Sequence, residues 1–107
     1  MFVENDKVLP QKCGEGVERK ILGTGGSLMM VEVSFKKGSI GAMHTHEHEQ
    51  VSYIAKGSFE FTVDGERKTV NQGDSLYIPS GAVHGTVALS DAVVVDIFTP
   101  IREDFLE

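Results

Sequence analysis

Apolar and polar residues alternate with a period of two along most of this chain, and this feature restricts it to β-strands. The alternation runs through residues 31–35, 59–63, 76–78 and 87–89, where side chains two apart share one face. No segment has the three- and four-residue apolar spacing of an amphipathic helix over three turns. Turn sequences separate the alternating segments at roughly ten-residue spacing. The pattern therefore predicts an all-β, antiparallel sandwich or barrel.

One turn can be predicted in detail. Asp64-Gly65 lies between two alternating segments, residues 59–63 and 66–70. Both central residues accept positive φ, which a two-residue hairpin turn requires. We therefore expect a tight hairpin here.

Length, charge and cysteine content exclude several classes of protein. The 107 residues are enough for one domain,. The 16 acidic residues outnumber the 10 basic ones, and the basic ones are not clustered, which argues against nucleic acid as a partner,. The chain has no membrane-spanning apolar run and no signal-peptide pattern at its start, so we expect a soluble cytoplasmic protein with no membrane partner. The single cysteine, Cys13, cannot form an internal disulfide,.

Histidines give the strongest chemical signal. His44, His46 and His48 fall within five residues, and His84 is the fourth histidine. In a strand, His44 and His46 point to one face and can bind one ion. A third ligand from this segment requires a bend after His46, because a straight strand carries Gln50 about 20 Å from His44. Spacing alone does not choose between His48 and Gln50.

The glycines and histidines together resemble the two motifs of the cupin family. The first motif is matched by Gly38, His44, His46, Gln50 and Gly57, with Gln50 where many cupins have Glu. The second is matched by Gly73, Pro79, Gly81 and His84, with Ala88 where the family usually has Asn. The resemblance implies a jelly-roll-like cupin barrel. Its expected core is residues 31–98 of a single domain 1–107, with an arm or edge strand over 1–20 and a tail over 99–107.

The resemblance also implies a metal held by His44, His46, Gln50 and His84. These donors are neutral, so a divalent ion would keep nearly its whole charge and would attract an anionic substrate. Zn or Ni are the first expectation, with Fe, Mn and Co as alternatives. The absence of thiolates argues against a structural zinc site. The alternative for the histidine segment is a merely polar face, and His48 is expected in solvent or beside the ligands.

A second candidate cluster lies near the end of the chain. Asp96 interrupts the apolar strand 93–98, and a carboxylate inside a barrel is costly unless it is paired or functional,. Phe98 shares its face, and Arg102 follows at the expected mouth, where it can bind a carboxylate. Alternatively, Asp96 and Arg102 pair with each other. Tyr53 and Tyr77 are either cavity hydroxyls or packing residues.

These segments resemble the pectin-degradation cupins of the KdgF type. The similarity lies in residues 48–53, 73–79 and 96–106. It implies an enzyme that converts 4,5-unsaturated monouronates from pectin or alginate into linear ketouronates, with Asp96, Phe98 and Arg102 at the substrate. Two alternatives stay open: another small-molecule cupin enzyme, such as an isomerase or dioxygenase, and a non-catalytic metal- or sugar-binding module. We further expect a homodimer, because cupins commonly pair through edge strands.

Overall fold

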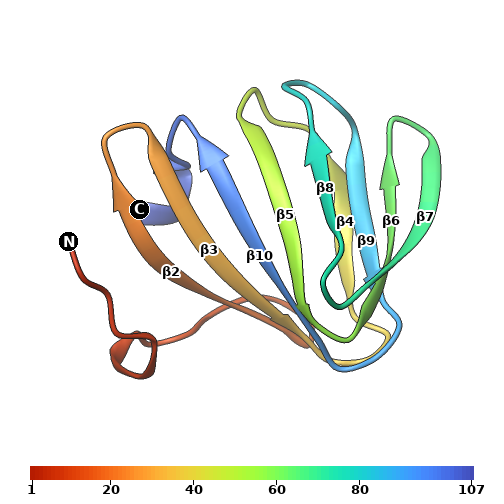
Figure 1. Cartoon of the computed structure of the whole chain (residues 1–107), viewed down its shortest axis with the longest axis horizontal. Coiled ribbons are helices and arrows are strands. Elements are labelled where there is room, and N and C mark those ends of the chain that lie inside the picture. The colour runs from red at the N-terminus through yellow and green to blue at the C-terminus, as the bar shows by residue number, and fades with distance from the viewer.

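The computed structural model describes residues 1–107, which form two antiparallel sheets (Figure 1). The six-stranded sheet contains, in spatial order, β1 (Gln11–Gly14), β2 (Val17–Gly25), β3 (Leu28–Phe35), β10 (Ala92–Thr99), β5 (Glu49–Lys56) and β8 (Ser75–Ile78). The four-stranded sheet contains β4 (Ile40–His44), β9 (His84–Ala88), β6 (Ser58–Val63) and β7 (Glu66–Asn71). Two short 3-10 turns, η1 (Asn5–Lys7) and η2 (Glu103–Leu106), lie near the chain ends. Neither helical segment is long and apolar enough to cross a membrane.

The architecture confirms the all-β, jelly-roll prediction. The predicted hairpin is β6–β7, and its turn residues Asp64 and Gly65 have φ of 48° and 84°. No hydrogen-bonded ladder joins the two sheets into a closed barrel. Strands β1, β8, β4 and β7 are therefore edges, and pairing of a second copy at such an edge stays a prediction.

The first 20 residues are more regular than an arm. β1 is the edge strand allowed by the sequence, but residues 17–20 already belong to β2, which pairs with β3 along its length. Val17 is buried and Ile21 packs against a core cluster, so this strand has an apolar inner face. The irregular part of the chain thus ends before Gln11.

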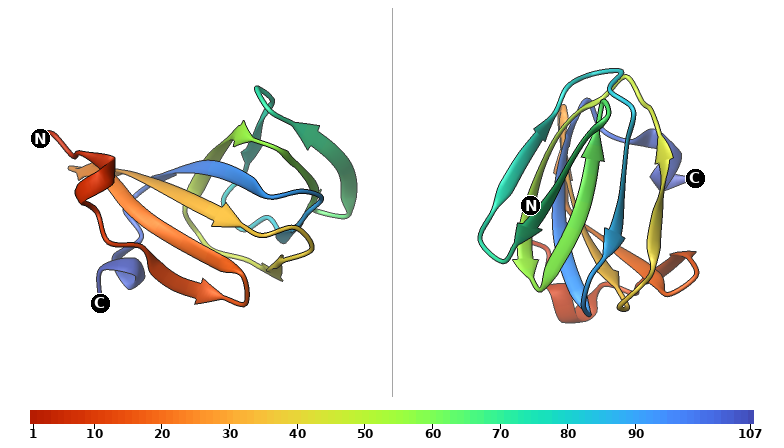
Figure 2. Two further views of the ribbon diagram at one scale, coloured as in Figure 1. Left: turned by 90° about the horizontal axis from the view of Figure 1, so that it is seen from below. Right: turned by 90° about the vertical axis from the view of Figure 1, so that its right-hand side faces the viewer.

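Aromatic and branched side chains close one end of the space between the sheets. Phe59 and Ile54 are fully buried there, and the Phe35 and Phe59 rings meet edge to face with centroids 5.1 Å apart. A fully buried side chain of this size contributes roughly 1.5–3 kcal/mol. The other end carries the β4–β5 and β8–β9 connections, at the top of Figure 1, and Figure 2 shows the same arrangement from below and from the side.

Two glycines separate the effect of close packing from that of backbone conformation. Gly57 and Gly65 both have positive φ, but a Cβ on Gly57 would lie 2.6 Å from the Asp91 carbonyl oxygen, whereas a Cβ on Gly65 would meet nothing within 4 Å. We expect Gly65→Ala to lower the free energy of unfolding by about 1 kcal/mol, and Gly57→Ala to lower it by about 2 kcal/mol more. Urea unfolding measures both. Equal losses would contradict the packing shown at Gly57.

Candidate metal site and cavity

Three histidines from distant parts of the chain meet at the open end of the sheets. His44 ends β4, His84 begins β9, and the two are direct cross-strand partners. His46 lies just beyond β4. The ring centroid of His84 is 4.3 Å from that of His44 and 4.8 Å from that of His46. The structure therefore brings together the histidines of both sequence motifs.

The bend expected after His46 is present, and it favours Gln50 over His48. The chain leaves β4 at His44, bends at residues 47–48 and enters the other sheet at Glu49. Gln50 is buried, and its Oε1 lies 3.0 Å from His46 Nε2. His48 is half-buried, and its Nε2 lies 3.2 Å from the Ile101 carbonyl oxygen. Its ring centroid is 5.5 Å from that of His46, so His48 lies beside the ligand candidates and also contacts the C-terminal tail.

Backbone carbonyls set the proton positions on the three imidazoles. The Nδ1 atoms of His44, His46 and His84 lie 2.8, 3.0 and 2.9 Å from the carbonyl oxygens of residues 42, 48 and 82. An imidazole that donates from Nδ1 presents a lone pair at Nε2. Each Nε2 is therefore free to bind a cation.

The donor set fits a divalent metal. One ligand atom from each of the three imidazoles lies within 4.8 Å of the others. Two ligand atoms on one ion, each bonded at about 2.1 Å, are at most ~4.2 Å apart, so the cluster is slightly wider than a metal-bound one. His84 Nε2 is buried with no hydrogen-bond partner. His46 Nε2 faces the Gln50 carbonyl oxygen, which places two lone pairs together unless a cation or a proton lies there,. These observations indicate a divalent metal site.

A hydrogen-bond relay fixes the orientation of the Gln50 amide. Gln50 Nε2 donates to Ser52 Oγ at 2.9 Å, and Ser52 Oγ donates to Asp96 Oδ1 at 2.7 Å. The amide oxygen must then point toward His46. Ser52 was missed in the sequence, although it lies two residues from Gln50 on the same face of β5.

Burial shifts the pKa values of the ionisable groups at this site. It lowers the pKa of His46 and His84, and the positive charge of Arg102 acts in the same direction. Burial also raises the pKa of Asp96 to about 6, against the opposing hydrogen bond from Ser52. Burial therefore favours the neutral form of these two imidazoles, and Asp96, with a pKa of about 6, exchanges a proton close to neutral pH.

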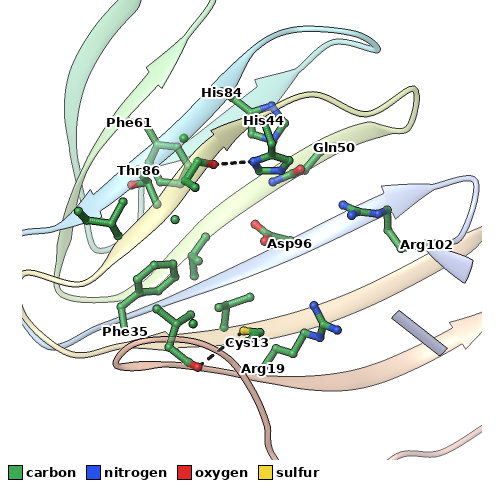
Figure 3. Close-up of a pocket in the computed structure, with 18 of the residues that line it drawn as sticks. Cys13, Arg19, Phe35, His44, Gln50, Phe61, His84, Thr86, Asp96 and Arg102 are labelled. Atoms are coloured by element: carbon green, nitrogen blue, oxygen red, sulfur yellow. Dashed lines mark hydrogen bonds between the residues drawn. The ribbon is translucent and has the colours of Figure 1, made fainter. Parts of the chain in front are cut away.

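A cavity of about 430 Å³ opens beside these residues (Figure 3). Val94, Asp96 and Phe98 line it from one face of β10, as the alternation predicted. Tyr53 and Tyr77 are 48% and 54% exposed and do not line it. The tyrosines are thus not cavity hydroxyls, and because β5 and β8 direct them outward they do not pack inside the fold.

Arg102 lies at the cavity wall but does not pair with Asp96. Its Nε and Nη2 donate to the two carboxylate oxygens of Asp104 at 3.1 and 2.9 Å. Its guanidinium carbon lies 4.2 Å from the ring centroid of Phe105 and 5.1 Å from that of Phe98. A second cavity residue, Arg19, also contacts Phe105 and was not singled out in the sequence.

Comparisons with known proteins agree with this geometry. The Cupin domain family matches residues 31–98. The pectin degradation protein KdgF of Dickeya dadantii is 40% identical over 104 residues, 95% of this chain and 94% of that protein. The structure of KdgF from Halomonas sp. superimposes with a TM-score of 0.94 at 37% identity, covering 98% of this chain and 97% of that one.

The crystal structure of an RmlC-like cupin from Shewanella frigidimarina is equally similar. Its TM-score is 0.94 at 38% identity, covering 97% of this chain and 94% of that one. Fold, histidine cluster and sequence therefore agree, and this chain belongs to the cupin family, in the group that includes the KdgF proteins.

Proposed function

We propose that this protein is a metal-dependent enzyme that converts 4,5-unsaturated monouronates into linear ketouronates. The observation that carries the proposal is Asp96, a carboxyl with a raised pKa that lines the cavity beside the three imidazoles. The KdgF relatives, named for pectin degradation, support a uronate as the substrate. A cavity of about 430 Å³ falls within the usual range for a small-molecule site,.

The proposed metal ligands are His44, His46, Gln50 and His84, and we propose Zn or Ni as the ion. Such an ion, bound by neutral donors, acts as a Lewis acid toward sugar oxygens. Gln50 contributes through its orientation, since the Ser52 relay holds its oxygen toward the imidazoles.

The reaction is an isomerisation that needs one proton delivered and one removed. C4 of the ring double bond gains a proton, the C1 hydroxyl loses one, and the bond between C1 and the ring oxygen breaks, which leaves an aldehyde and a ketone. We propose that Asp96 moves a proton, because a pKa of about 6 suits both steps near neutral pH,. Ser52 positions its carboxyl through the 2.7 Å hydrogen bond.

Phe98 and Arg102 shape the substrate side of the cavity in this proposal. The Phe98 ring is buried and forms an apolar wall next to Asp96, which limits access of water. Arg102 supplies positive charge at the mouth, and its side chain is held by Asp104 and by the aromatic rings. This local positive charge attracts an anionic sugar to the cavity, although the net charge of the whole chain is -6,.

Replacing Asp96 tests the catalytic role. We expect Asp96→Asn to slow the decay of ultraviolet absorbance of unsaturated galacturonate by about 100-fold or more, relative to wild type and after subtraction of spontaneous ring opening, with metal content unchanged. Glu66→Gln, on the exposed β6–β7 hairpin, is the matched control and should keep full activity. A wild-type protein that binds the sugar tightly but leaves the absorbance flat would be a binding module instead.

The same variant should be more stable than wild type when metal-free. The carboxyl has a pKa of about 6 in the folded chain, against an ordinary value of 3.8 for aspartate, so deprotonation favours unfolding. Asp96→Asn should therefore raise the free energy of unfolding by about 2 kcal/mol above pH 6, and the gain should disappear between about pH 6 and pH 4. Urea unfolding across this range measures it. A variant less stable than wild type at about pH 7.5 would contradict the burial of an unpaired carboxylate.

Replacing His84 and His48 in turn distinguishes a metal ligand from a residue that only lies beside the metal site. We expect His84→Ala to weaken zinc and nickel binding by more than about 100-fold and His48→Ala by less than about 10-fold. His84 Nε2 has no partner within the protein, whereas His48 Nε2 lies 3.2 Å from the Ile101 carbonyl oxygen. Zinc and nickel binding by the wild-type protein should weaken as the pH drops below about 6, because protons then compete with the metal for the imidazole nitrogens. Calorimetric titration of untagged protein measures each constant. Equal losses in the two variants would exclude the proposed ligand set.

A further inference from the structure

Arg19 is a charged residue on the inner face of a strand. On β2 it alternates with Val17 and Ile21, which belong to or pack against the two apolar clusters of the interior. Arg19 is half-buried and lines the cavity. A cation in such a position is costly unless it meets an anion. The inner position of Arg19 therefore calls for an anionic partner.

The chain itself provides no anion for Arg19. Its three ion pairs are Lys7–Glu4, Arg67–Glu60 and Arg102–Asp104. The one polar partner of Arg19 is the neutral cross-strand residue Gln11, whose Oε1 accepts a hydrogen bond from Nε at 3.3 Å. This contact orients the guanidinium and leaves both Nη groups without a hydrogen-bond partner. These Nη groups, which could donate hydrogen bonds to a carboxylate, thus have no partner within the protein.

Phe105 holds the two cavity arginines apart. The guanidinium carbon of Arg19 lies 3.9 Å from the ring centroid, and that of Arg102 lies 4.2 Å from it. Two guanidinium groups this close to one centroid cannot share a face, so they stack on opposite faces of the ring. Arg102 has committed Nε and Nη2 to Asp104. Arg19 is therefore the one of these two arginines whose guanidinium group has no carboxylate partner.

Cavity charge also favours an anion near Arg19. The cavity lining contains one carboxylate, that of Asp96, and two permanently charged cations, Arg19 and Arg102. In the view of Figure 3, Asp96 lies between Gln50 and Arg19, and Arg102 lies to one side. An anionic sugar lying across Asp96 would therefore extend from the imidazole cluster toward Arg19.

We propose that Arg19 is the residue that binds the carboxylate of an anionic monosaccharide in this cavity, held in position by Gln11 and Phe105. Arg102, engaged by Asp104, adds charge and supports the opposite face of Phe105. The inference rests on the proposed function only in its choice of a uronate as the ligand, since the observations themselves require only a carboxylate.

Binding of an unreactive sugar tests this assignment without turnover. In calorimetry on metal-loaded protein, wild type should bind saturated galacturonate more tightly than galactose. Arg19→Gln should weaken galacturonate binding by about 10- to 100-fold, the usual effect of losing a charged hydrogen bond. Arg19→Lys, which keeps the charge but loses the planar fork, should show a smaller loss. Arg67→Gln is the control, because Arg67 is exposed and remote from the cavity.

Kinetics on unsaturated galacturonate separate binding from chemistry. Arg19→Gln should raise KM by a similar factor and leave kcat within about 3-fold. The assignment is overturned if folded Arg19→Gln binds galacturonate as tightly as wild type, or if wild type does not prefer galacturonate to galactose. An absence of turnover combined with the predicted binding losses would reject the enzymatic proposal and keep the assignment.

Discussion

The site depends on one cross-strand pair, His44 with His84, at the end where the two sheets are open. Register between β4 and β9 fixes these two imidazoles opposite each other. The crossing from β4 to β5 adds His46 from the connection and Gln50 from the other sheet. Apolar side chains around Phe59 fill the far end, so polar groups gather where packing leaves space. A one-residue slip in the β4–β9 register would turn His84 to the opposite face and dismantle the cluster.

The neutral amide of Gln50 and the buried carboxyl of Asp96 are connected at this end of the fold. An amide at Gln50 keeps a carboxylate out of the imidazole cluster, and Ser52 links that amide to the carboxyl of Asp96. Burial holds the Asp96 pKa near 6, so the carboxyl does not act as a permanently charged group. The same burial makes the site costly to the fold, as is usual where chemistry requires a shifted pKa.

Sequence reasoning succeeded where local rules decide the structure. Asp64-Gly65 needed only turn chemistry. The convergence of His44, His46 and His84 was implied by the resemblance to the two cupin motifs. Sequence reasoning was less informative where tertiary packing decides. The apolar residues Val87 and Leu89 mark β9, but the buried residues of this strand are His84, Gly85 and Ala88. A Cβ on Gly85 would lie 2.6 Å from Met43 Sδ, so contact with β4 leaves no room for a side chain there. The choice between His48 and Gln50 needed the bend between sheets. Arg19 was overlooked because its inner position became evident only once β2 was known to be a strand.

The central claim is that three imidazoles and one amide oxygen bind one divalent ion. X-ray absorption spectroscopy of the untagged protein, loaded with zinc or nickel and combined with elemental analysis, tests it most directly. We expect about one ion per chain, bound by three imidazoles and otherwise only by nitrogen or oxygen atoms. A sulfur neighbour, which only Cys13 or a methionine could supply, or a spectrum with fewer than three imidazoles would contradict it.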